Sequence, residues 1–145
     1  MNKIEGMEKD FKQARLVYIT TFSEEGRKRN RAMTNYNEDP YEMMWFPTFK
    51  ETRKVEDIKR NPKVLITFPS HKRGEFYEIE GTAELEDEKV VRDKWKWWFL
   101  YWLPDEEFRH RITTDAPITN RTIINVIPKS ARIVKQIQVS RSNIQ

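Results

Sequence analysis

The strongest constraint on the fold is a succession of short stretches rich in β-branched and aromatic residues. They lie at residues 14–22, 27–36, 41–48, 63–69, 76–86, 122–128 and 131–139. Turn sequences such as SEEG, NEDP and SHKRGE separate several of them, and strands joined by short turns pair antiparallel. Such sheets commonly close into barrels, which removes exposed edges. We therefore expect a mainly β protein, an antiparallel barrel of six to seven strands with inserted helices, in a single domain over residues 1–145.

Helical spacing of apolar residues appears in three segments. Residues 3–13 place Ile4, Met7 and Phe11 on one face, and a helix over 50–60 ends before Asn61-Pro62. The third segment places Val91, Trp95, Trp98 and Trp102 on one face at a 4-3-4 spacing. Its second half, WKWWFLYW at 95–102, is apolar all round and predicts a core or subunit interface.

Composition narrows the classes of function. The chain has no cysteine and only two histidines, His71 and His110, which lie far apart, so we expect no metal site. The charged N-terminus and the lack of an apolar run of about 20 residues predict a cytoplasmic protein without a signal peptide or membrane span. The carboxylates show no apolar pair of the kind tuned for acid–base catalysis, so no catalytic residue is assigned.

Residues 46–62, FPTFKETRKVEDIKRNP, place two cations near the expected start of a helix. The macrodipole makes that end positive, so cations are normally found at the other end. One interpretation is a capping box of Thr48 and Glu51, with the helix cations solvated. The other is a phosphate cradle, in which Thr52, Arg53 and Lys54 combine with free backbone N–H groups. Both interpretations remain open on the residues alone.

The basic run RKRNR at 27–31 precedes this segment. In a strand, Arg27, Arg29 and Arg31 share one face. We expect most of the run to be a solvated hairpin. Arg31 differs because Ala32 and Met33 follow it as the strand turns apolar. A cation at that boundary could reach an anion held at the end of the neighbouring strand.

The order and spacing of several motifs resemble those of a known family. The motifs are Arg31-Ala32-Met33, Trp45-Phe46-Pro47-Thr48, Thr52-Arg53-Lys54, Asn61-Pro62 and Gly81-Thr82-Ala83-Glu84-Leu85. Over roughly residues 14–90 the chain resembles the pyridoxamine 5'-phosphate oxidase-related FMN-binding family, most closely its general-stress-protein branch. The resemblance implies an FMN-binding split β-barrel and a homodimer with FMN at the subunit interface.

The resemblance also implies roles for six residues. Arg31 and Thr48 would contact the phosphate or ribityl chain, and the backbone of Met33 would lie along the isoalloxazine. Arg53 and Lys54 would bind the phosphate, and Thr52 holds the usual serine position. Two departures are Ala32 in place of the common proline and Pro47, which has no backbone N–H, just before Thr48.

The function that follows is a flavin-dependent oxidoreductase acting on a small molecule, with the substrate pocket in the variable residues 95–121. The alternatives are a deazaflavin-dependent reductase and a non-enzymatic flavin or haem binder on the same fold. A nucleic-acid binder that uses RKRNR is the least favoured, and we expect neither nucleic acid nor membrane as a partner. The ending ARIVKQIQVSRSNIQ lacks the Arg-x-His pattern of true pyridoxamine 5'-phosphate oxidases, so that activity is not expected.

Overall fold

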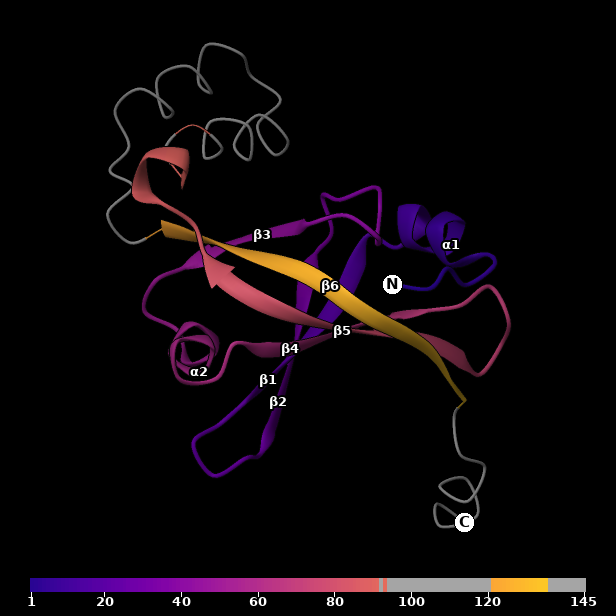
Figure 1. Cartoon of the computed structure of the whole chain (residues 1–145), viewed down its shortest axis with the longest axis horizontal. Helices are drawn as coiled ribbons and strands as arrows, with labels where there is room; N and C mark the ends of the chain where they lie inside the picture. Colours follow the sequence, from indigo (N-terminus) through magenta and orange to yellow (C-terminus); the bar gives the residue numbers. More distant parts are fainter. Residues whose placement is uncertain (92, 94–120, 136–145) are drawn as a thin grey trace.

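The computed structural model describes residues 1–91, 93 and 121–135, and these carry all that follows. The elements are α1 Met7–Gln13, β1 Leu16–Phe22, β2 Lys28–Thr34, β3 Met44–Phe49, α2 Arg53–Arg60, β4 Lys63–Pro69, β5 Glu75–Leu85 and β6 Arg121–Lys135. The strands form one antiparallel sheet in the order β2-β1-β4-β5-β6-β3. The sheet curls, and α1 and α2 lie at opposite ends of it (Figure 1). The expected mainly β antiparallel architecture is confirmed.

The concave side of the sheet holds the hydrophobic core. Successive side chains of a strand point to opposite faces, so every second residue of β1, β4 and β5 is buried. The cluster comprises Met7, Phe11, Val17, Ile19, Met44, Phe46, Ile58, Val64, Ile66, Phe68, Tyr77, Ile79, Ala83, Ile124 and Val126. Helix α2 contributes Ile58 and α1 contributes Met7 and Phe11, so both helices are fixed by their apolar faces.

The two strands predicted at 122–128 and 131–139 are wrong as separate elements, because β6 runs unbroken from Arg121 to Lys135. The Pro-Lys-Ser sequence does not end the strand. It is accommodated by a register shift against β5, where Gly81 faces Pro128 and Glu80 faces Ser130. Lys129 is therefore an extra residue, as in a β-bulge, and proline within a sheet is tolerated at such positions.

The capping box of Thr48 and Glu51 is also wrong. Thr48 lies inside β3, where it is buried and faces Thr122 of β6. Helix α2 begins at Arg53, not at residue 50, and Thr52 is its N-cap. The Thr52 Oγ1 accepts a hydrogen bond from the N–H of Val55 at 3.4 Å. The helix therefore begins at Arg53 and Lys54 themselves, rather than a few residues before them.

Helix α1 is shorter than the predicted 3–13, because Gly6 adopts a left-handed conformation with φ 86° just before Met7. The helix is tied to the β4–β5 hairpin by the carboxylate of Asp10, which is only 6% exposed. Asp10 Oδ2 accepts hydrogen bonds from the Tyr77 hydroxyl at 2.7 Å, the His71 ring at 2.8 Å and the His71 backbone N–H at 3.1 Å. Burial raises the pKa of Asp10, but these bonds outweigh it and hold the pKa below 3.8.

Strand β3 is an edge of the sheet, and a side chain closes that edge in part. Asn37 donates to the carbonyl of Trp45 at 3.0 Å and accepts from its N–H at 2.9 Å. Since backbone groups alternate in direction along a strand, Pro47 also turns its nitrogen toward the free edge. The missing N–H of Pro47 therefore removes no hydrogen bond to β6.

Two features predicted from the sequence lie wholly or mostly outside the described residues. Of the helical face of Val91, Trp95, Trp98 and Trp102, only Val91, which is buried, lies among the described residues. The Trp-rich segment 95–102 and His110 lie outside them. Among the helices that the structure describes, none is long and apolar enough to cross a membrane.

Gly81 provides a test of the bulge. A Cβ at this position would lie 2.7 Å from Val126 Cγ1 and 2.8 Å from the carbonyl oxygen of Ile127. Gly81→Ala should therefore push β5 and β6 apart and destabilise the fold by about 1–3 kcal/mol. Thermal unfolding should show a Tm lower by about 3–9 °C. Thr82→Ala, the next residue on the opposite face, should change Tm much less, and an unchanged Tm for Gly81→Ala would contradict the close approach.

Candidate functional site

The turn between β3 and α2 presents polar groups at the start of the helix. The Thr52 hydroxyl donates to the carbonyl of Phe49 at 3.2 Å, which fixes the helix start to the end of β3. Arg53, the first helical residue, is exposed, whereas Lys54 is only 8% exposed. The N–H groups of Arg53 and Lys54 have no intrahelical acceptor, as is usual in a first helical turn. This end of α2 therefore carries free donors and positive charge.

Lys54 lies within the electrostatic influence of another cation. Burial lowers the pKa of Lys54, and the charge of Arg31 on β2 lowers it further. Neither side chain forms an ion pair with any carboxylate among the described residues. The Lys54 ammonium also makes no hydrogen bond within this part of the chain. The interpretation in which the helix cations are solvated therefore does not hold for Lys54, because its side chain is buried.

Two like charges close together, one of them buried, are unfavourable unless an anion lies with them. The positive end of the helix macrodipole adds to the same field. Backbone N–H groups, a threonine hydroxyl, an ammonium and a guanidinium are the donors used to bind phosphate in proteins. The arrangement therefore suits an anion with several acceptor oxygens.

The six residues singled out in the sequence are brought together to different degrees. Thr52, Arg53 and Lys54 form the helix start, and the charge of Arg31 acts on Lys54. Thr48 lies on β3, four residues before Thr52, and is buried. Met33 lies on the same face of β2 as Arg31, two residues along, and packs against the core. Their roles toward a ligand remain predictions.

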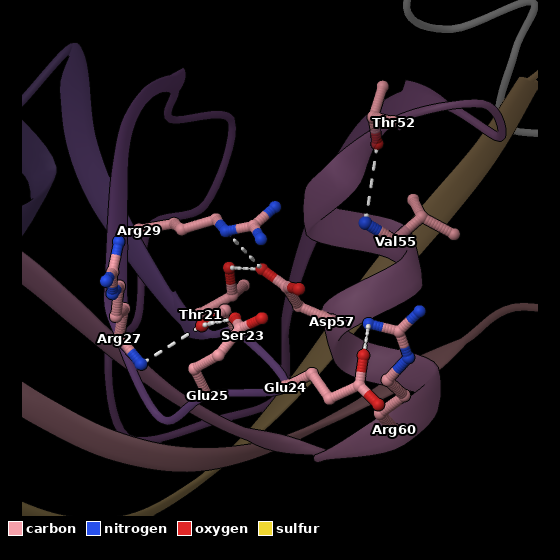
Figure 2. A network of polar contacts seen from close by, with 10 residues as sticks. All are labelled: Thr21, Ser23, Glu24, Glu25, Arg27, Arg29, Thr52, Val55, Asp57 and Arg60. Carbon is pink, nitrogen blue, oxygen red and sulfur yellow. Dashed lines mark hydrogen bonds and ion pairs between the residues drawn. The ribbon is translucent and has the colours of Figure 1, made fainter.

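The sequence analysis missed a buried carboxylate on α2. Asp57 is 1% exposed and accepts a hydrogen bond from Thr21 Oγ1 on β1 at 2.9 Å. Its Oδ2 also lies 3.6 Å from Arg29 Nε on β2 (Figure 2). One signal was available: Asp57 follows Lys54 by three residues and adjoins Ile58, so it belongs to the inward face of the helix. No pattern in the sequence identifies Thr21 as its partner.

The other end of α2 is exposed and solvated. Arg60 and Glu24 form an ion pair at 3.6 Å between side chains that are 53% and 73% exposed. Such a pair contributes little to stability. Within residues 1–91, 93 and 121–135, no three histidine or carboxylate side chains gather as metal ligands.

Comparison with known proteins places this arrangement in a family. A family model described as pyridoxamine 5'-phosphate oxidase like matches residues 2–116. The chain belongs to this family. The match extends well beyond the 14–90 over which the motifs carried the resemblance. No curated protein shows significant similarity to the chain.

Solved structures share the fold. A Listeria innocua protein provisionally assigned as a pyridoxamine 5'-phosphate oxidase is 26% identical, with 87% of this chain and 93% of that chain covered and a TM-score of 0.65. An F420 reductase is 22% identical, with 90% and 98% covered and a TM-score of 0.63. A pyridoxamine 5'-phosphate oxidase-related, FMN binding protein from Nostoc punctiforme is 15% identical, with 88% and 78% covered and a TM-score of 0.61.

General stress protein 26 from Bacillus anthracis is a further neighbour, 20% identical, with 88% and 93% covered and a TM-score of 0.60. Structures related to the pyridoxamine 5'-phosphate oxidase-like family and to general stress protein 26 thus share the architecture seen here. The prediction of a split β-barrel of this family is confirmed.

The buried charge of Lys54 predicts a conflict between stability and binding. Because its pKa is lowered, the folded chain holds the Lys54 proton less tightly than the unfolded chain, so charged Lys54 opposes folding below the lowered pKa. Lys54→Met should stabilise the ligand-free protein at pH 7 by about 1 kcal/mol, since it replaces a desolvated charge with an apolar chain. Chemical denaturation would measure this change.

The matched control is Lys59→Met on the exposed face near the end of the same helix. It should leave the free energy of unfolding nearly unchanged. A Lys54→Met protein less stable than the wild type would show that the ammonium has a stabilising partner, against the cationic site described above.

Proposed function

We propose that this protein binds FMN and works as a flavin-dependent oxidoreductase. Arg53 and Lys54, with Thr52 in the usual serine position, would bind the phosphate, and Arg31 and Thr48 would contact the phosphate or the ribityl chain. The backbone of Met33 would lie along the flavin ring. The observation that carries the proposal is the buried Lys54 ammonium beside Arg31 at the start of α2. The family of the chain and an FMN binding protein among its structural neighbours support the choice of ligand.

The phosphate of FMN fits the physical needs of this site. A phosphate monoester carries about −1.5 to −2 charges at pH 7 and three strong acceptor oxygens. It would turn the repulsion between Arg31 and Lys54 into two attractions. It would also accept hydrogen bonds from the free N–H groups of the first helical turn.

The bound flavin would supply the redox chemistry. The residues of this chain would hold its phosphate and orient the ring, and no residue is assigned as an acid or a base. The proposed substrate is a small molecule, and its pocket is proposed to lie in residues 95–121.

A deazaflavin is the second candidate, because an F420 reductase has the same fold. A deazaflavin with a phosphate group would use the same cationic site. The absorption spectrum of the purified protein and titrations with the two cofactors would separate them.

The phosphate assignment is tested by reversing one charge. Lys54→Glu should weaken FMN binding at least tenfold, because one charge-assisted hydrogen bond is lost and a negative charge faces the phosphate. Quenching of flavin fluorescence during a titration measures the Kd. Lys59→Glu, on the exposed part of the same helix, is the control, and unchanged affinity of Lys54→Glu would reject the assignment.

We also propose a homodimer with the flavin near the subunit interface. Leu16 and Tyr18 of β1 point away from the core and are 53% and 45% exposed, in alternation with buried Val17 and Ile19. Large apolar side chains on one outer face are suited to a second copy of the chain.

The dimer predicts a change of mass on substitution. Tyr18→Glu should shift the protein from dimer toward monomer in size-exclusion chromatography with light scattering, because a carboxylate would be buried at the interface. The exposed Glu8→Gln on α1 should leave the mass unchanged. A wild-type protein that is monomeric at high concentration would contradict the dimer.

A further inference from the structure

Asp57 connects α2 to both strands of the β1–β2 hairpin. Its carboxylate accepts a hydrogen bond from Thr21 on β1 and lies within ion-pair distance of Arg29 on β2. Thr21 and Arg29 are direct partners in the antiparallel register, so Asp57 sits over one cross-strand pair. Figure 2 shows both side chains pointing toward the helix. A carboxylate that is 1% exposed needs such partners, because an unpaired buried charge is strongly unfavourable.

Lys54 and Arg31 are the cations nearest to this interaction on the same faces of α2 and β2. Lys54 precedes Asp57 by three residues, about 4.5 Å along the axis and on the same side of the helix. Arg31 follows Arg29 by two residues, about 6.6 Å along β2 and on the same face. When Asp57 lies over Arg29, the preceding turn of the helix directs Lys54 toward Arg31, whose charge lowers the pKa of Lys54. The first interaction is attractive and the second repulsive.

The interaction of Asp57 with Arg29 also determines which cations remain available to bind a ligand. Arg29 and Arg31 share the face of β2 that meets α2, but Arg29 is compensated by Asp57. Arg31 and Lys54 have no such carboxylate among the described residues. Asp57 therefore neutralises Arg29, which has a structural role, and leaves Arg31 and Lys54 available to bind a ligand.

We propose that Asp57 is the positioning residue of the phosphate site, which it serves by holding α2 on Thr21 and Arg29 so that Lys54 stays against Arg31 before any anion binds. This inference rests on the proposed function and deepens it. Holding two cations together in the free protein removes part of the unfavourable free energy of assembling the site when FMN binds. Asp57 does not contact the ligand in this arrangement.

The decisive variant is Thr21→Val, because it removes the hydroxyl and keeps the shape and charge of the buried site. FMN affinity should fall about tenfold, the size of one hydrogen bond to a charged group. Riboflavin, which lacks the phosphate, should bind as it does to the wild type. Thr21→Ser keeps the hydroxyl and should restore FMN affinity. Titrations of both flavins followed by fluorescence quenching give the two Kd values for each variant.

Two further variants provide a stronger change at the same interaction and a control. Asp57→Ala should reduce FMN affinity more than Thr21→Val, again without a matching loss for riboflavin. Glu24→Gln breaks the exposed ion pair with Arg60 at the other end of the helix and should leave both affinities unchanged. Equal losses for FMN and riboflavin in Thr21→Val, or no loss for FMN, would overturn the positioning role.

The outcomes separate this inference from the proposed function. If the wild type binds no FMN, or if Lys54→Glu leaves its affinity unchanged, the phosphate site itself is rejected. If the wild type binds FMN and Lys54→Glu abolishes binding while Thr21→Val has no effect, only the positioning role of Asp57 is rejected.

Discussion

The buried carboxylate of Asp57 is the interaction on which the arrangement of the site depends. A short helix of eight residues has little stability of its own, so its position must come from tertiary contacts. The apolar contact of Ile58 holds α2 against the core, but an apolar contact leaves rotation and sliding poorly defined. The directional hydrogen bond from Thr21 and the charge of Arg29 define them. The location of Lys54 follows from that register.

A similar device operates at the opposite end of the molecule. Asp10 ties α1 to the β4–β5 hairpin through the Tyr77 hydroxyl and two hydrogen bonds from His71. The side chain of His71 is 56% exposed, yet its ring is hydrogen-bonded to the carboxylate of Asp10. Both helices thus combine an apolar face with one buried aspartate. In each case the carboxylate accepts hydrogen bonds from residues distant in the sequence.

The alternation of apolar residues was sufficient to predict most strands, and β4 was predicted with its observed bounds of 63–69. Helix ends were less predictable, because Thr48 and Thr52 are both plausible caps and only the length of β3 decides between them. The break at Pro128 was misread because a bulge depends on the partner strand, where Gly81 leaves room. The sequence did not predict the burial of Lys54 or the partners of Asp57, because the packing of α2 on β1 and β2 is a long-range property. The order of short motifs nevertheless identified the family.

The amide of Asn37 has a consequence for assembly. It occupies both backbone groups of Trp45 on the outer edge of β3, where a strand from another molecule would otherwise add. Such β-augmentation is a common route to aggregation and to continuous intermolecular sheets. With the amide in place, and with Pro47 offering no donor two residues further on, this edge is a poor template. An assembly of copies through this side of the sheet would therefore rely on side chains, which can be selective in a way that backbone pairing is not.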